Sequence, residues 1–255
     1  MNGHVTTATD ADGICTVTFF HPAHNSLPGR ILAELAAAIT AAGQDAAAKV
    51  IVLRSEGNRT FCAGASFDEL RAIENAEQGL QFFSGFAHVI NACRTSPKLI
   101  IGRVQGKAVG GGVGVAAATD YCLATEAAAV KLSELAVGIG PFVVGPAVER
   151  KIGASAFAQL AIDATEFRSA QWARDRGLYA DVLPDEASLD AAVQALAQRL
   201  AASSPEAMRE LKQVLWAGTE HWDDLLIERA GISGRLVLTE ATKAFIARVK
   251  GWGCT

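Results

Sequence analysis

Residues 105–120 read QGKAVGGGVGVAAATD, and the interpretation of the whole chain starts from this stretch. Four glycines, Gly110, Gly111, Gly112 and Gly114, stand at the start of an alanine-rich run that resembles a helix. Each glycine costs a helix about 1 kcal/mol relative to alanine, so helix stability does not explain them. Glycine does permit close backbone approach, and free N–H groups at a helix N-terminus attract electron-rich groups. The stretch therefore predicts a helix start whose backbone donors face a ligand.

A carboxylate follows about twenty residues later, because Glu134 stands among the apolar residues Leu132 and Leu135. A carboxylate in such surroundings is unusual unless it is paired or has a function. Backbone donors together with one isolated carboxylate are the outline of an active site for enolate chemistry. Each feature alone also has an ordinary explanation, since glycine-rich turns often serve packing and Glu134 could cap a helix or form an ion pair.

The composition of the 255 residues is that of a folded chain, with 50% hydrophobic and 20% charged residues. The net charge of −4 and the lack of a run of Lys or Arg argue against nucleic acid or a membrane as partners. Five scattered cysteines without a C-x-x-C pair, and histidines without metal spacing, indicate neither a disulfide framework nor a metal site. With no signal peptide and no apolar run of transmembrane length, we expect a soluble cytoplasmic protein.

Strand-like and helix-like segments alternate over the first 140 residues, which predicts an α/β fold. The expected strands cover residues 13–20, 49–54, 99–104 and 121–124, and the continuous apolar runs at 49–54 and 99–104 are typical of buried strands. The expected helices in this part cover residues 30–42, where Ile31, Leu35 and Ile39 form an apolar stripe, and residues 79–94. Beyond Pro146 the pattern is helical, over residues 147–152, 154–164, 169–176, 189–202, a segment from Ser204, and 220–250. The prediction is an α/β core followed by a helical C-terminal region.

Five motifs in chain order resemble one known family. They are Asn25-Ser26-Leu27, the loop from Phe61 to Ser66, Gly110 to Gly112, Ser133-Glu134 with Gly138 and Pro141, and Phe167 to Ala170 with Gly177-Leu178. In this order and spacing they resemble the crotonase superfamily, the enoyl-CoA hydratase/isomerase family. The resemblance covers most of the chain.

The resemblance implies a spiral of ββα turns that forms two sheets in residues 1–200, and a C-terminal helical region in residues 201–255 that serves trimerisation. The assembly would be a homotrimer or a hexamer built as a dimer of trimers. The implied substrate is an acyl-CoA thioester, as in fatty acid metabolism, with coenzyme A as part of the substrate and no other cofactor.

The resemblance also implies roles for individual residues. The backbone N–H groups of Ala65 and Gly111 would hold the thioester oxygen, and Glu134 would act as general acid and base. Removing a proton beside a thioester puts negative charge on that oxygen, and each preorganised donor there is worth about 10²–10³-fold in rate. The implied substrate-contacting residues are Ser26, Ala63, Phe67, Gly110, Gly112, Pro141 and Phe142.

This chain departs from the two-glutamate pattern of the family's hydratases. The first of those glutamates falls on Gly114, and the place where other members carry an acid after the later proline is Phe142. One remaining carboxylate, Glu134, suits a reaction in which a single base removes a proton and returns it elsewhere. Isomerisation of an enoyl-CoA double bond is therefore the leading prediction. Ser66 also stands where hydratases often have aspartate.

Several alternatives stay open at this stage. The same site would support enoyl-CoA hydration, or decarboxylation or hydrolysis of a CoA ester, and an inactive CoA-ester-binding scaffold would keep the fold alone. A nucleic-acid-binding role is disfavoured because residues 30–42 contain no lysine. A dinucleotide site lacks its third glycine and its acidic residue. Cys62 beside the first loop is interpreted as a small buried thiol.

Overall fold

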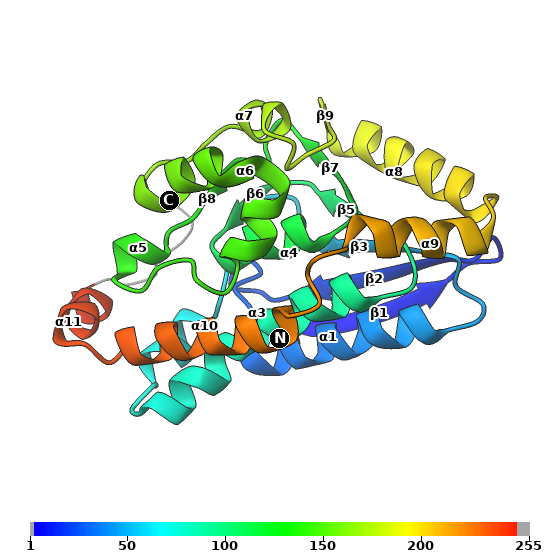
Figure 1. The fold of residues 1–255 in the computed structure, drawn as a ribbon. Coiled ribbons are helices and arrows are strands. Elements are labelled where there is room, and N and C mark those ends of the chain that lie inside the picture. The colour runs from blue at the N-terminus through cyan, green and yellow to red at the C-terminus, as the bar shows by residue number, and fades with distance from the viewer. Residues whose placement is uncertain (1–2, 249–255) are drawn as a thin grey trace.

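The computed structural model describes residues 3–248, which form two β-sheets enclosed by helices (Figure 1). The larger sheet has six strands in the order β1-β2-β3-β5-β7-β9, and the smaller has three in the order β4-β6-β8. The strands of the larger sheet are β1 (His4–Thr9), β2 (Ile14–Phe20), β3 (Val50–Ser55), β5 (Ile100–Val104), β7 (Tyr121–Thr125) and β9 (Asp181–Leu183). Those of the smaller sheet are β4 (Thr60–Cys62), β6 (Lys107–Val109) and β8 (Val130–Lys131).

The larger sheet is parallel except at its edge, where β1 pairs antiparallel with β2. In its centre Ile51 pairs with Ile100 and Val52 with Ile101. The strands β3 and β5 are buried almost throughout, as expected of parallel strands covered on both faces. The predicted α/β class and all four predicted strands are confirmed. No strand was predicted at β1, β4, β6, β8 or β9.

Helices cover both faces of the larger sheet. Leu189 and Val193 of α8 (Glu186–Ala201) pack on one face against Val52 and Ile101. The other face belongs to the main core, which includes α1 (Gly29–Gln44) and α3 (Ala76–Thr95). The apolar stripe predicted for residues 30–42 is buried there, and α1, α3 and α10 (Trp222–Leu236) lie side by side (Figure 1).

The remaining helices are α2 (Phe67–Arg71), α4 (Gly111–Ala118), α5 (Glu134–Val137), α6 (Gly145–Ile162), α7 (Ala170–Asp175), α9 (Pro205–Leu215) and α11 (Glu240–Arg248). Ser204 caps α9 as predicted, since its side chain accepts a hydrogen bond from the N–H of Ala207. The two helices expected around residue 153 form α6, which changes direction at Gly153. The segment predicted as continuous over 220–250 instead divides into α10 and α11, and its residues 249–250 lie outside the described part.

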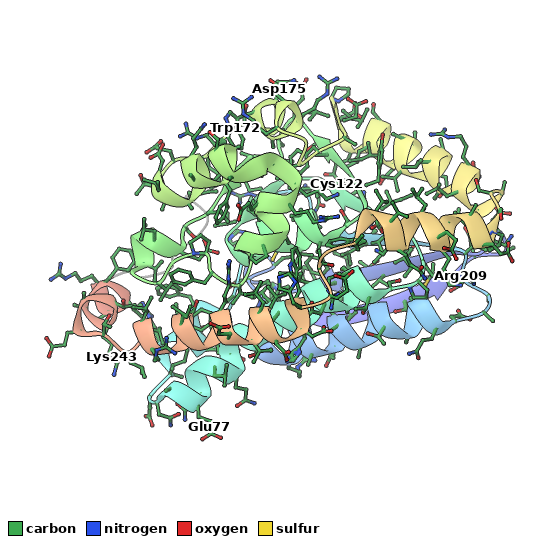
Figure 2. All side chains as sticks on the ribbon, in the orientation of Figure 1. Glu77, Cys122, Trp172, Asp175, Arg209 and Lys243 are labelled. Atoms are coloured by element: carbon green, nitrogen blue, oxygen red, sulfur yellow. The ribbon has the colours of Figure 1, made fainter. Side chains whose placement is uncertain are left out.

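Figure 2 shows how the side chains are distributed. Glu77, Arg209 and Lys243 lie at the periphery, whereas Cys122 lies inside beneath the helices. Burial raises the pKa of the Cys122 thiol to about 12. No helix in residues 3–248 combines the length and the apolar character needed to cross a membrane.

A buried ion pair joins the C-terminal helices to the core. The Lys212 ammonium lies 2.7 Å from Oδ2 of Asp120, and these side chains are 3% and 5% exposed. The same carboxylate accepts hydrogen bonds from the N–H of Ile100 and from the indole N–H of Trp216. Lys212 also donates to the carbonyl of Cys93, so α9 is attached to α3 and to the loop before β7. The trimerisation role expected for residues 201–255 stays a prediction.

We predict that Lys212→Ala lowers the free energy of unfolding by about 3–5 kcal/mol, because it leaves the Asp120 carboxylate buried without its cation. Urea unfolding measures this loss. Glu34→Ala is the control, since it removes an exposed i,i+4 pair with Arg30 and should cost under about 1 kcal/mol. Equal losses of unfolding free energy in the two variants would contradict the stabilising role of the buried Lys212–Asp120 ion pair.

Candidate active site

The loop after β4 is held by the turn that ends at Leu27. The N–H of Ala63 donates to the carbonyl of Asn25, the N–H of Leu27 to that of Gly64, and the N–H of Ser66 to that of Leu27. Because a trans peptide points its C=O and N–H in opposite directions, the bond at the Gly64 carbonyl turns the Ala65 N–H away from Leu27. Within residues 3–248 that N–H has no hydrogen-bond partner. It is free to bind a ligand.

The turn itself is fixed by Asn25, a buried residue with a φ of 55°. Its side-chain oxygen accepts from the N–H of His21, and its amide nitrogen donates to the carbonyls of Glu56 and Thr60. Asparagine tolerates this left-handed conformation better than most residues. Ser26 donates its hydroxyl to the Ala65 carbonyl at 2.8 Å. The structure thus places Ser26 behind the loop.

Ser66 and Glu69 complete this support. Ser66 caps α2, because its hydroxyl accepts from the N–H of Glu69. The Glu69 carboxylate accepts from the N–H of Gly29 at 2.7 Å, at the start of α1. Glu69 therefore caps α1, and Ser66 caps α2 at the position where hydratases of the family often have aspartate.

The second donor is the N–H of Gly111, the first residue of α4. Gly110 precedes it with a φ of 53°, a conformation that glycine adopts at little cost. The Gly111 N–H has no hydrogen-bond partner in the described residues, as is usual for the first turn of a helix. A Cβ added to Gly64 would lie 3.5 Å from this nitrogen, so the two loops are adjacent. The free N–H groups of Ala65 and Gly111 are therefore brought close together.

Close packing explains two of these glycines. A Cβ at Gly111 would come within 2.3 Å of the Phe86 ring, and a Cβ at Gly112 within 2.4 Å of the Cys62 carbonyl oxygen. Gly112 therefore lets α4 approach β4 and lies outside the cavity lining. Burial raises the pKa of the Cys62 thiol to about 12, which leaves it un-ionised near neutral pH, in agreement with its interpretation as an inert buried thiol.

Glu134 is the first residue of α5, and its carboxylate lies against Gly110. A Cβ at Gly110 would lie 3.2 Å from Oε1 of Glu134. Part of the residue reaches solvent, but Oε2 is buried and has no hydrogen-bond partner among the described residues. Burial raises the pKa of Glu134 to about 7, against a smaller opposing effect of its own backbone N–H. The site therefore holds a carboxylate poised to exchange a proton near neutral pH.

A cavity of about 90 Å³ connects these groups. Eight of the ten predicted site residues line it, namely Ala63, Ala65, Phe67, Gly110, Gly111, Glu134, Pro141 and Phe142. Ser26 and Gly112 do not. The prediction missed further lining residues, which include Leu70, Phe82, Phe83, Phe86, Ser133, Val137, Ile139, Val143, Val144 and Ser233. The three phenylalanines of α3 form an aromatic cluster visible in the sequence, whereas nothing in the sequence links Ser233 of α10 to this place.

The position expected for a second glutamate is occupied by packing. A Cβ at Gly114 would come within 2.5 Å of Cγ1 of Val144 and within 3.5 Å of Ile90. Glu134 is the single carboxylate among the described residues that line the cavity. No group of three potential metal-ligating side chains occurs within residues 3–248.

Comparisons with known proteins agree with this fold. The enoyl-CoA hydratase/isomerase family matches residues 9–232. A probable enoyl-CoA hydratase of Bacillus subtilis is 31% identical over 205 residues, which are 80% of this chain and 79% of that protein. A (7aS)-7a-methyl-1,5-dioxo-2,3,5,6,7,7a-hexahydro-1H-indene-carboxyl-CoA hydrolase of Rhodococcus jostii is 30% identical over 211 residues, 83% of this chain and 80% of that protein.

A similar solved structure is the enoyl-CoA hydratase of Bacillus halodurans. It superposes with a TM-score of 0.87 at 20% sequence identity, over 96% of this chain and 99% of the Bacillus halodurans chain. The two proteins therefore share the same fold. The chain belongs to the enoyl-CoA hydratase/isomerase family of the crotonase superfamily. As a member of that family it is an enzyme that acts on CoA thioesters.

We predict that the charge of Glu134 destabilises the folded chain as pH rises. Because burial raises its pKa from 4.5 to about 7, the folded state keeps a proton that the unfolded state releases between these values. The free energy of unfolding should fall across this window by about 3 kcal/mol, at about 1.4 kcal/mol per pH unit. Glu134→Gln lacks this ionisation, so urea unfolding should show the variant gaining about 3 kcal/mol relative to wild type between pH 4.5 and pH 7.5. A stability difference that does not change with pH would contradict the raised pKa.

Proposed function

We propose that the protein is an enoyl-CoA isomerase that moves a double bond from the 3- to the 2-position of the acyl chain. The observation that supports this proposal is that Glu134 is the single carboxylate among the described cavity residues. It lies beside the two free backbone N–H groups of Ala65 and Gly111. A single base suits a reaction in which a proton is removed at one carbon and returned at another.

In this mechanism the thioester oxygen of a 3-enoyl-CoA lies between the N–H groups of Ala65 and Gly111. The Glu134 carboxylate removes a proton from C2, and the electron pair of that C–H bond delocalises into a dienolate whose negative oxygen accepts both hydrogen bonds. Glu134 then returns the proton to C4, and the double bond forms between C2 and C3. The dipole of α4 adds partial positive charge at Gly111.

Hydration is the second candidate, because the Bacillus subtilis relative is a probable enoyl-CoA hydratase. The hydroxyls of Ser133 and Ser233 give it a specific support, since both residues line the cavity and neither hydroxyl has a hydrogen-bond partner in the described chain. In this candidate reaction the two hydroxyls would hold the attacking water molecule, the role that a second glutamate has in the family's two-glutamate hydratases. Hydrolysis is suggested by the name of the Rhodococcus jostii relative.

The assay that tests the proposal supplies 3-enoyl-CoA and 2-enoyl-CoA separately to wild type and to Glu134→Gln. We predict double-bond migration without water addition by the wild type, and a loss of about 10²–10⁴-fold in kcat in the variant, as for removal of a general acid–base group. Chromatography of the esters and assay of free CoA identify the product. Rapid hydration of the 2-enoyl ester would favour the second candidate, and free CoA would favour hydrolysis. Inactivity of the wild type on all CoA esters would support a binding scaffold.

We also predict that kcat/KM for isomerisation rises with pH to a plateau, with a midpoint near pH 7. The base must be ionised in the free enzyme, and burial raises the pKa of Glu134 to about 7. Rate measurements from pH 5.5 to pH 8.5 at constant ionic strength test this. A rate that does not change over this range would place the midpoint below pH 5.5 and show that the carboxylate is solvated before the substrate binds.

A further inference from the structure

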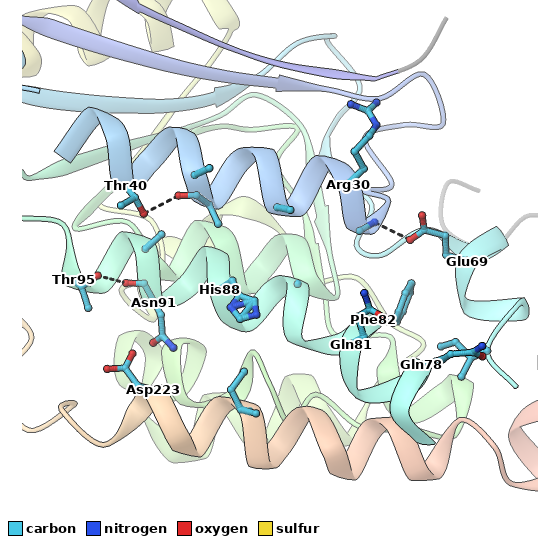
Figure 3. A pocket seen from close by; sticks show the side chains of 18 of the residues that line it. Arg30, Thr40, Glu69, Gln78, Gln81, Phe82, His88, Asn91, Thr95 and Asp223 are labelled. Atoms are coloured by element: carbon cyan, nitrogen blue, oxygen red, sulfur yellow. Dashed lines mark hydrogen bonds between the residues drawn. The ribbon is translucent and has the colours of Figure 1, made fainter. Parts of the chain in front are cut away.

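Two hollows of different size lie on either side of α3. One is the cavity of about 90 Å³ that contains Glu134. The other is an open groove of about 1050 Å³ between α1, α3 and α10 (Figure 3). Phe82 alone among the described residues lines both hollows, so its side chain is the partition between them.

Phe82 is a fixed part of this wall. Its ring meets that of Phe83 edge to face, with centroids 5.0 Å apart, and it belongs to a buried apolar cluster with Leu70, Ile73 and Val237. It is 9% exposed. Packing from several elements therefore keeps the ring in place between cavity and groove.

The cavity is small for an acyl group. At about 10–15 Å³ for each water-sized group, its volume of about 90 Å³ holds about six to nine such groups. Its lining includes Ala65, Gly111 and Glu134, so the thioester end of the substrate uses part of this space. The remaining room suits a short acyl group.

The cavity also lacks a partner for a second negative charge. Its described lining contains no Lys, Arg or His, and its one ionisable side chain is Glu134. A carboxylate at the far end of an acyl group would be buried without a cation and would face the Glu134 carboxylate, and both effects oppose binding.

We propose that Phe82 is a specificity-determining residue that closes the acyl cavity and restricts it to short, uncharged acyl groups. A longer chain that extends from the cavity toward the groove meets the Phe82 ring, which lines both. The inference rests on the thioester position of the proposed function but not on the reaction that follows.

The test measures equilibrium binding of saturated butanoyl-CoA and dodecanoyl-CoA, which cannot isomerise, by calorimetry. Wild type should bind dodecanoyl-CoA at least tenfold more weakly than butanoyl-CoA. Phe82→Ala should improve dodecanoyl-CoA binding at least tenfold and leave butanoyl-CoA within about threefold of wild type. If Phe82→Ala does not melt cooperatively, Phe82→Leu replaces it, with the same direction of change for octanoyl-CoA.

Phe83→Ala is the matched control, because it removes an equal volume from the cavity wall but does not line the groove. It should not improve dodecanoyl-CoA binding. Gln81→Ala, which alters the groove alone, should change neither ester. Equal gains in Phe82→Ala and Phe83→Ala, or a wild type that binds both chain lengths equally, would overturn the role of Phe82.

The charge restriction is tested with succinyl-CoA and butanoyl-CoA, whose four-carbon acyl groups differ in a terminal carboxylate. Succinyl-CoA should bind at least tenfold more weakly to wild type and to Phe82→Ala, and equal binding would overturn this part. Failure of wild type to bind butanoyl-CoA at all would overturn the proposed function itself, whereas normal butanoyl-CoA binding without isomerase activity would overturn the reaction and leave the specificity inference standing.

Discussion

Close packing around α4 is the constraint on which this site depends. Gly111, Gly112 and Gly114 bring the helix against Phe86, Cys62 and Val144 at distances that a Cβ could not share. The approach seats the first turn of α4 beside the loop that carries Ala65. A larger side chain at any of the three positions would push the helix away from its neighbours, because a Cβ there would overlap their atoms. The glycines therefore weaken α4 locally but allow it to pack closely against these neighbours.

The same packing sets the chemistry of the carboxylate. Glu134 lies against Gly110, and its buried oxygen finds no hydrogen-bond partner among the described residues. This arrangement is unfavourable for the ionised form, and the raised pKa is its direct result. The hydrogen bonds behind the loop that carries Ala65 contrast with this arrangement. The side-chain oxygen and nitrogen of Asn25 both have hydrogen-bond partners, and these bonds hold the loop in place. The site therefore combines a loop whose supporting polar groups are hydrogen-bonded with a carboxylate whose buried oxygen is not.

Predictions of secondary structure succeeded where the periodic signal was long. The stripe of Ile31, Leu35 and Ile39 predicted α1, and continuous apolar runs predicted β3 and β5. The short strands β4, β6 and β8 have two or three residues each, too few to show a period. The break between α10 and α11, at Val237, Leu238 and Thr239, contains neither the glycine nor the proline that most clearly marks a helix end. Contacts with neighbouring segments of the folded chain decide where such short strands form and where such a helix ends.

The sequence by itself determined the motifs and the chemical types at the site: glycines that free backbone donors, one glutamate, and apolar residues at positions 114 and 142. These follow from residue identity, and family resemblance placed them in order. Only the tertiary structure decided that Val144 fills the space beside Gly114, that Ser26 and Gly112 lie outside the cavity, and that Phe82 separates it from the groove. Such facts depend on which side chains meet across distant segments, because burial and steric closure are properties of the packed chain and have no local signature.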